Sequence, residues 1–264
     1  MNMNYGLILD PIVEKDYIFG AAKELTLGGE VLQPDGQWDA YLPSNEVQNL
    51  TNIETFACVS FATTNCVEVL ERRIYLSSQN WSDRFLATIS GTAWQKGNSP
   101  QFVAEILRKK GCVEERDYPF SQDVDTYDKY YKTIPQNLYT LALQFIAEYS
   151  FGHEYVNSNP KDMMNALKYS PLLFTTYAWV KNADGLYYKP SGVQDNHATM
   201  CYGYEEGKFW KIFDSYLGEG STCFKKVEWN SLPQQVKRFT LTRQIAVESS
   251  WSKFLTLLRS ILGL

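Results

Sequence analysis

The sequence contains very little histidine and no closely paired cysteines. Only two histidines, His153 and His197, occur among its 264 residues. The five cysteines are widely spaced and include no C-x-x-C pair, so we expect neither a zinc site nor another metal site. Because their number is odd, at least one thiol must be free, and we expect a reduced, intracellular protein.

Long apolar runs and dense blocks of one charge are also missing. No stretch reaches the ~18 apolar residues of a membrane span, and the start lacks the basic opening of a signal peptide. The net charge is -5 with mixed signs and no dense Lys/Arg block, so we expect no nucleic-acid binding. Hydrophobic residues make up 44% and aromatic residues 15%, which predicts a soluble, cytoplasmic globular protein.

The hydrophobic pattern changes from helical to strand-like along the chain. Apolar residues recur at helical spacing in four stretches, 55–74, 100–110, 138–149 and 161–168. After Pro171, β-forming residues dominate four others, 172–180, 197–204, 208–213 and 224–229. The polar stretch 121–137 is expected to be a loop. This order predicts an α+β protein of two lobes.

We divide the chain into four parts on this pattern. They are an N-terminal extended segment (1–45), a helical lobe (46–150), a β-rich lobe (151–245) and a C-terminal amphipathic helix (246–264). The last part has apolar residues at helical spacing and only two basic residues. It could dock on its own domain or attach to a partner protein, whereas a membrane surface is a weaker interpretation.

Cys58 is the strongest candidate for a reactive group. It falls at the first turn of the first predicted helix, where the helix dipole and unpaired N–H groups lower the pKa of a thiol. The thiolate is the nucleophile in thiol-dependent acyl transfer. Cys66 lies two turns deeper and is expected in the core. If an imidazole assists the thiol, it must be His153, in a predicted loop, or His197, at a strand start.

Asp214 is the candidate partner of His197. The strand ending before it would pair antiparallel with the His197 strand across the turn at 205–207, which would bring the carboxylate near the imidazole. A carboxylate there accepts the imidazole N–H and fixes the tautomer. In isolation, Asp214 could equally well cap a turn.

Four segments resemble the papain family of cysteine peptidases, in the family's order, across residues 46–235. They are Cys58-Val59-Ser60-Phe61-Ala62 at the nucleophile, Gly111-Cys112-Val113 followed by Tyr118-Pro119-Phe120, the strand His197-Ala198-Thr199-Met200-Cys201-Tyr202-Gly203-Tyr204, and Trp210-Lys211-Ile212-Phe213-Asp214-Ser215-Tyr216. Each segment alone is a weak match, and the four together are a specific one.

The resemblance implies a helical lobe and an antiparallel, β-barrel-like lobe with the active-site cleft between them. It also implies hydrolysis of peptide or isopeptide bonds in a peptide or protein substrate, through a thioester and without a cofactor. Gly97 and Asn98 match the family's Gly-Gly segment that pairs with the substrate backbone, and Asn196 matches a cleft-lining position. Tyr216 stands where the family has a tryptophan shielding the third catalytic residue.

The sequence departs from the family at several positions. Asp214 replaces the usual asparagine, so we expect altered pH behaviour. The family's oxyanion glutamine could correspond to Gln48 or to Asn52, and we favour Gln48; such a donor is worth roughly 2.7–4 kcal/mol. The part ahead of Gln48 is shorter than the inhibitory pro-segment of lysosomal members. We therefore expect the activity to be restrained by something else, such as a partner, confinement or narrow specificity. These departures favour a microbial or viral branch, with a virion- or phage-associated location as an alternative.

Two other functions remain open. The order Cys58, His197, Asp214 also occurs in transglutaminase-like thiol acyltransferases, where aspartate is the usual third residue. A papain-like scaffold could also serve as a non-enzymatic structural or assembly protein, docked through its C-terminal helix.

Overall fold

The computed structural model describes residues 5–13, 16–19, 29–51 and 53–244. The helices are α1 (Cys58–Tyr75), α2 (Asp83–Ile89), α3 (Pro100–Lys110), α4 (Tyr127–Tyr130), α5 (Gln136–Glu148) and α6 (Pro160–Leu167), with short 3-10 turns η1 (Asp39–Tyr41) and η2 (Glu219–Ser221). The strands are β1 (Tyr149–Tyr155), β2 (Leu172–Thr176), β3 (His197–Glu205), β4 (Phe209–Phe213), β5 (Phe224–Glu228) and β6 (Val236–Arg243).

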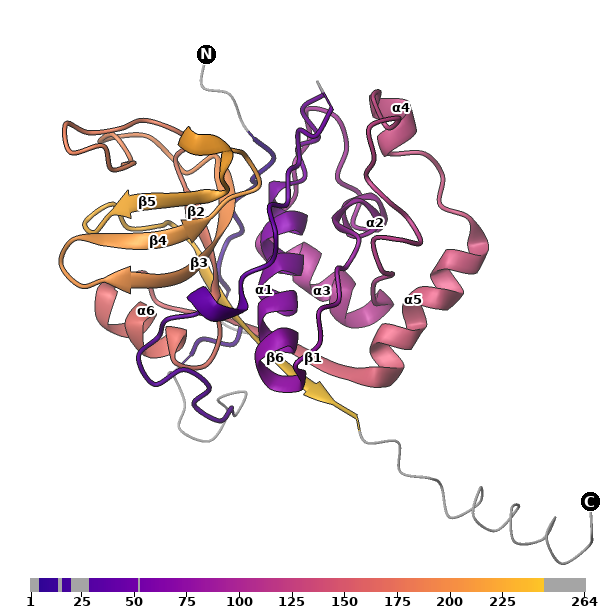
Figure 1. Ribbon diagram of the computed structural model, residues 1–264, viewed down its shortest axis with the longest axis horizontal. Helices are drawn as coiled ribbons and strands as arrows, with labels where there is room; N and C mark the ends of the chain where they lie inside the picture. Colours follow the sequence, from indigo (N-terminus) through magenta and orange to yellow (C-terminus); the bar gives the residue numbers. More distant parts are fainter. Residues whose placement is uncertain (1–4, 14–15, 20–28, 52, 245–264) are drawn as a thin grey trace, which may run out of the picture.

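The strands form one open sheet in the order β1-β6-β2-β3-β4-β5, and every neighbouring pair is antiparallel. Figure 1 shows β2 to β5 on one side of the molecule and α2 to α5 on the other, with α1 standing between them. The β1–β6 pair extends from the sheet beneath the helices. The α+β class is therefore confirmed.

The central helix α1 is buried on almost all sides. Its buried residues run without interruption from Cys58 to Glu71, because the sheet packs on one face and α2 and α3 pack on the others. Two buried carboxylates of α1 accept hydrogen bonds from Trp81. Glu68 accepts its backbone N–H at 2.7 Å, and Glu71 accepts its indole N–H at 2.9 Å. Buried polar groups need such partners, so these bonds fix the chain after α1.

Most predicted elements occur close to their expected bounds. Helix α3 matches its prediction because Ser99 accepts the backbone N–H of Phe102 at the start and Gly111 ends the helix at φ 74°. The short helices α2 and α4 were not predicted. The expected loop around His153 is wrong, since β1 pairs with β6 along its whole length, from Tyr149↔Arg243 to Tyr155↔Lys237.

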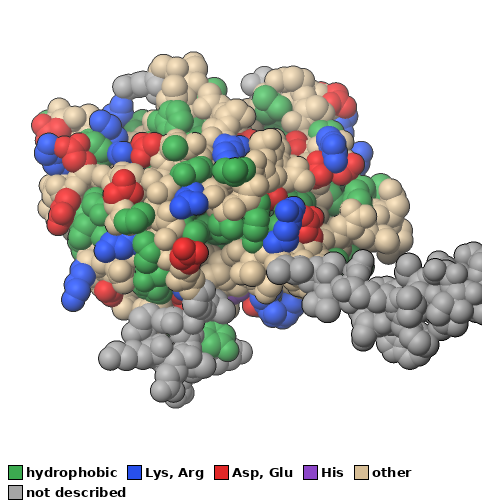
Figure 2. Space-filling view, turned by 60° about the horizontal axis from the view of Figure 1, so that its bottom comes forward, with side chains coloured by type: hydrophobic (Ala, Val, Ile, Leu, Met, Phe, Trp, Pro, Cys, Tyr) green, Lys and Arg blue, Asp and Glu red, His purple; other side chains and the backbone are tan. Residues whose placement is uncertain are grey.

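The surface carries charges of both signs. On the face drawn in Figure 2, Lys/Arg and Asp/Glu side chains are interspersed and do not gather into one patch. No helix within the described ranges is both long and apolar enough to cross a membrane. The predicted C-terminal helix, 246–264, lies outside the described residues.

Candidate active site

Cys58 is the first residue of α1 and is completely buried. Burial raises the pKa of its thiol, Glu54 and Asp214 raise it further, and hydrogen bonds from the Ala198 and Val59 backbone lower it without reversing the net rise. The lowered pKa expected from the helix terminus is therefore absent in this structure, because desolvation outweighs the dipole. Cys58 is held as a neutral thiol beside the start of β3.

His197 and Asp214 meet as the strand register predicts. Met200 on β3 pairs with Phe213 on β4, so Asp214 follows directly and its Oδ1 lies 2.6 Å from His197 Nε2. Both residues are fully buried. The other ring nitrogen, Nδ1, has no hydrogen-bond partner among the described residues. If Nε2 donates its proton to Asp214, Nδ1 keeps a free lone pair that can accept a proton.

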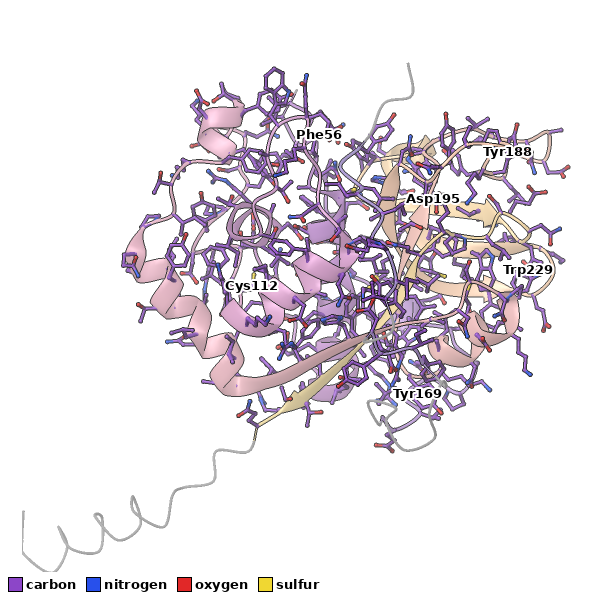
Figure 3. The ribbon with its side chains drawn as sticks, turned by 180° about the vertical axis from the view of Figure 1, so that it is seen from behind. Phe56, Cys112, Tyr169, Tyr188, Asp195 and Trp229 are labelled. Atoms are coloured by element: carbon purple, nitrogen blue, oxygen red, sulfur yellow. The ribbon has the colours of Figure 1, made fainter. Side chains whose placement is uncertain are left out.

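The structure thus brings Cys58, His197 and Asp214 to one place. The thiol of Cys58 interacts with the backbone of Ala198, the residue next to His197. In Figure 3, Phe56 and Asp195, which precede α1 and β3, lie at the same end of the molecule, near the junction between helices and sheet. A nucleophile, an acceptor nitrogen and an orienting carboxylate at one junction are the parts that thiol acyl transfer requires.

Asp214 has a second partner. Lys225 on β5 donates from Nζ to the Asp214 Oδ2 at 2.5 Å. Burial raises the pKa of Asp214, but the charges of His197 and Lys225 and their hydrogen bonds outweigh burial and hold it below its usual value. Asp214 is therefore a carboxylate with both oxygens engaged.

Three aromatic rings surround the imidazole. The ring centroids of Tyr5, Trp179 and Tyr216 lie 5.6, 5.6 and 5.4 Å from that of His197. Tyr5 and Tyr216 also contact each other edge to face at 5.4 Å. These rings pack around the imidazole, and both His197 and Asp214 are fully buried.

Gln48 lies in a hydrogen-bonded cluster just ahead of Cys58. Its Nε2 donates to Glu54 Oε1 at 2.9 Å and lies 2.6 Å from the Tyr216 hydroxyl, while its Oε1 accepts from Ser215 at 2.6 Å. Glu54 also accepts the Phe56 backbone N–H at 2.9 Å. Both N–H bonds of Gln48 are thus directed at protein oxygens. The alternative donor, Asn52, lies outside the described residues.

Two of the positions expected to bind substrate, Asn98 and Asn196, form backbone hydrogen bonds with the chain's own N-terminal segment. The Tyr5 N–H donates to the Asn196 carbonyl at 3.0 Å, and the Ile8 N–H donates to the Asn98 carbonyl at 2.8 Å. The Asn98 N–H donates back to the Gly6 carbonyl at 2.8 Å, which makes a parallel bridge between Leu7 and Asn98. Residues 5–8 therefore run past Asn98 and Asn196, with the Tyr5 ring next to that of His197.

Two glycines make this close approach possible. A Cβ added to Gly6 would lie 2.0 Å from the Phe56 carbonyl oxygen, and one added to Gly97 would lie 1.9 Å from the Gly6 oxygen. Gly6 also has φ +111°, which side chains other than hydrogen disfavour. The N-terminal segment therefore packs directly against both Phe56 and Gly97.

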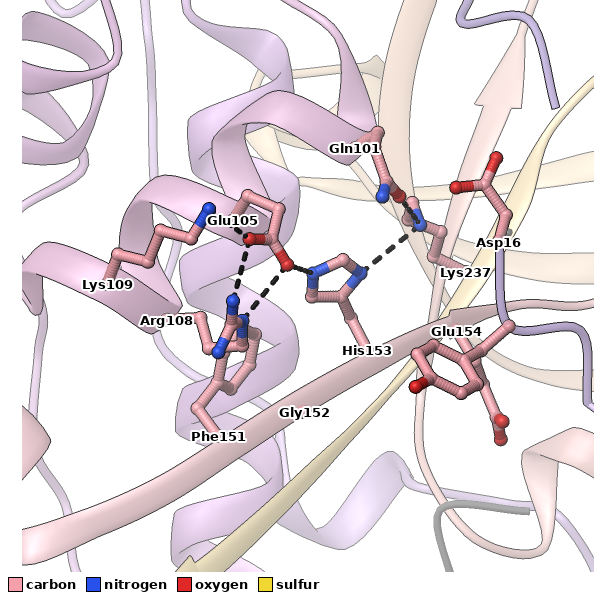
Figure 4. A pocket seen from close by; sticks show the side chains of 11 residues that line it. Asp16, Gln101, Glu105, Arg108, Lys109, Phe151, Gly152, His153, Glu154 and Lys237 are labelled. Carbon is pink, nitrogen blue, oxygen red and sulfur yellow. Dashed lines mark hydrogen bonds and ion pairs between the residues drawn. The ribbon is translucent and has the colours of Figure 1, made fainter. Parts of the chain in front are cut away.

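The second histidine belongs to a different place. His153, on β1, lines a pocket of about 630 Å³, where its Nε2 lies 2.9 Å from Glu105 Oε1 and its Nδ1 lies 3.3 Å from Lys237 Nζ (Figure 4). Burial and the nearby Lys237 lower the pKa of His153 to about 4. Both of its ring nitrogens have partners, so His197 is the histidine available to Cys58.

No group of three or more His, Cys, Asp or Glu side chains in the described part of the chain is arranged to hold a metal ion. All five cysteines are free thiols and buried.

Comparison with solved structures identifies this architecture as the papain-like fold. The chain is similar to xylellain, a cysteine protease from Xylella fastidiosa, with a TM-score of 0.65, 17% identity and coverage of 92% of this chain and 97% of that one. It is also similar to digestive procathepsin L2 of Tenebrio molitor, with a TM-score of 0.65, 17% identity and coverage of 90% and 78%. No protein-family model and no curated protein matches the sequence.

A plant enzyme shows the same likeness. Bromelain protease from Ananas comosus, solved in complex with the E64 inhibitor, has a TM-score of 0.55, 20% identity and coverage of 78% of this chain and 98% of that one. The predicted α+β papain-like fold is therefore confirmed. At these identities the likeness establishes the fold alone.

Four residues of the site were not predicted: Glu54, Trp179, Lys225 and Tyr5. Lys225 sits in the predicted strand 224–229 beside Lys226, and alternation alone does not say which of the two lysines points inward. Tyr5 gave no signal, because its role depends on where a distant segment lies.

Proposed function

We propose that this protein is a papain-like cysteine peptidase that uses Cys58, His197 and Asp214. The observation that carries the proposal is the buried, unpartnered Nδ1 of His197 on the strand that touches the Cys58 thiol. Nδ1 takes the thiol proton, and the sulfur attacks the carbonyl carbon of a peptide bond. The imidazolium then gives its proton to the leaving amine, a thioester forms, and water hydrolyses it.

Gln48 is the proposed side-chain donor to the oxyanion, together with the Cys58 backbone N–H. In this structure its Nε2 donates hydrogen bonds to Glu54 Oε1 and to the Tyr216 hydroxyl. A substrate oxygen arriving at the site would have to replace one of these acceptors. Because the amide is already held by Ser215, this exchange requires little movement of the side chain.

The substrate proposed is an extended peptide segment. Asn98 offers a backbone N–H and a carbonyl, and Asn196 offers a carbonyl, all of which pair with a peptide backbone in this structure. Residues 5–8 occupy these groups, so we propose that they keep the enzyme latent until they are displaced. The proposed specificity for a protein or peptide, including an isopeptide, follows from these backbone groups.

The test is hydrolysis of a mixed peptide library by the full chain and by Gly6→Ala, in which the segment cannot sit against Phe56. Cleaved peptides are identified by mass spectrometry, with Cys58→Ala and His197→Ala as inactive controls. We expect cleavage that depends on both residues. Transfer to an added amine without hydrolysis would favour the acyltransferase, and no turnover by either active chain would favour a structural role.

A further inference from the structure

Lys225 occupies an unusual place for a lysine. Strand β5 alternates between outward and inward residues, and Lys225 takes an inward position next to the buried Val227. Only 5% of its surface is exposed. Burying an ammonium group is unfavourable unless it is paired and hydrogen-bonded, so the strand must gain an interaction that an apolar residue would not provide.

The partners of Lys225 belong to the candidate active site. Its Nζ lies 2.5 Å from Asp214 Oδ2, 2.5 Å from the Tyr216 carbonyl and 5.1 Å from the centroid of the Trp179 ring. The other Asp214 oxygen binds His197 Nε2 at 2.6 Å. One carboxylate therefore bridges an imidazole and an ammonium group, and its two oxygens are divided between them.

The other ionisable groups near this bridge are acids. They are Cys58 on α1, Glu54 ahead of it, Tyr5 in the N-terminal segment, Tyr216 after β4 and Cys223 ahead of β5, each of which interacts with Asp214 or with its neighbours. Within the described residues, Lys225 is the only Lys or Arg that forms an ion pair with Asp214.

We propose that Lys225 is a positioning residue whose ammonium group offsets the charge of Asp214, so that the carboxylate orients His197 without trapping the imidazolium. This inference rests on the proposed peptidase function. A buried carboxylate alone favours the protonated imidazole and resists transfer of its proton to the leaving amine. The Asp214–Lys225 pair has little net charge, so it orients the ring as a neutral amide does.

Lys225 changes what Asp214 would do alone. A carboxylate in place of the family's asparagine predicts a more strongly held imidazolium and altered pH behaviour. With Lys225 bound to its second oxygen, the carboxylate keeps its geometry and loses most of its net charge. The lysine therefore compensates for the aspartate, and the two residues act as a unit.

The test follows the titration of His197 by NMR of nitrogen-15-labelled imidazoles in the full chain. The chain has only two histidines, so His153 serves as an internal reference. We expect Lys225→Met to raise the titration midpoint of His197 by about one pH unit or more, a tenfold change in proton affinity. Lys225→Arg should keep the wild-type midpoint, and His153 should not respond to either change.

Two further variants make the result specific. Asp214→Asn should lower the His197 midpoint, and the double variant Asp214→Asn/Lys225→Met should bring it back near the wild-type value. Lys237→Met removes a second buried lysine, which contacts His153, and should shift His153 only. Opposite shifts that cancel in the double variant are not expected from a loss of packing.

The proposal is overturned if Lys225→Met leaves the His197 midpoint unchanged or lowers it. If that variant does not fold, the double variant compared with Asp214→Asn carries the same test, because removing Lys225 must again raise the midpoint. The titration needs no turnover. Absence of hydrolysis would therefore overturn the proposed function and leave the electrostatic result standing, whereas hydrolysis without these shifts would overturn only the role of Lys225.

Discussion

Gly6→Ala should open the site with little effect on the rest of the fold. The added Cβ would lie 2.0 Å from the oxygen and 2.4 Å from the carbon of the Phe56 carbonyl, which are backbone atoms and cannot rotate away. The segment must therefore move. Moving it breaks three backbone hydrogen bonds, from Tyr5 to Asn196, from Asn98 to Gly6 and from Ile8 to Asn98.

The magnitude follows from these bonds. At about 1 kcal/mol net for each, their loss shifts the balance between closed and open segment by about 3 kcal/mol. Since about 1.4 kcal/mol is a tenfold change, the open population should rise about 100-fold. Alkylation of Cys58 requires the open state because its side chain is fully buried in the closed one. The rate of alkylation should rise by the same factor.

The assay is the rate of carbamidomethylation of Cys58 by iodoacetamide under native conditions, followed by peptide mass spectrometry. The matched control is Gly185→Ala, which also has positive φ, +77°, but has no atom within 4 Å of an added Cβ. We expect a wild-type rate for the control. Equal rates for Gly6→Ala and the wild type, or equal acceleration by both variants, would refute the idea that residues 5–8 close the site.

Three further predictions concern the oxyanion site and pH-dependent stability. Gln48→Ala should lower kcat for peptide hydrolysis about 100- to 1,000-fold with little change in KM, and an unchanged kcat would remove Gln48 from the mechanism. Burial and Glu115 raise the pKa of Glu46 to about 7. The folded state therefore holds the Glu46 proton more tightly than the unfolded state does, and the protein loses stability as pH rises from the ordinary pKa of Glu46 towards 7. In urea unfolding, the free energy of unfolding of Glu46→Gln should therefore increase by about 2 kcal/mol relative to the wild type between pH 5 and pH 8. A difference between the two proteins that does not change with pH would contradict this. The lowered pKa of His153 penalises the folded state as pH falls below its ordinary value of 6.5 towards 4. In the same measurement, the free energy of unfolding of His153→Gln should increase by about 2 kcal/mol relative to the wild type as pH falls from 7 to 5. Parallel plots of unfolding free energy against pH for the two proteins would contradict this.

The elements that carry the chemistry were accessible from the sequence because their signals are local. The start of α1 follows from apolar spacing, and α3 from its Ser99 cap and Gly111 stop. The meeting of His197 and Asp214 follows from two adjacent strands joined by a short turn. In these cases a few neighbouring residues determine the geometry.

The parts that were missed depend on distant contacts. Strand β1 has Gly152 at its centre, followed by His153 and Glu154, and only its pairing with β6, far along the chain, makes it a strand. The raised pKa of Cys58 follows from burial, which periodicity does not report. The course of residues 5–8 depends on Gly6 and Gly97 meeting across a large sequence separation. Local sequence patterns do not predict such contacts between residues far apart in the chain.

Labelling of the five thiols by a peptidyl epoxide tests the central claim most directly. Opening an epoxide requires a thiolate to attack carbon and an acid to protonate the oxygen, so it reports Cys58 and His197 together. All five thiols are buried, so exposure alone gives none of them an advantage. In the Gly6→Ala chain we predict modification of Cys58 alone, and its loss in the additional variant His197→Ala. Modification spread over several cysteines, or unchanged by removal of His197, would contradict the account.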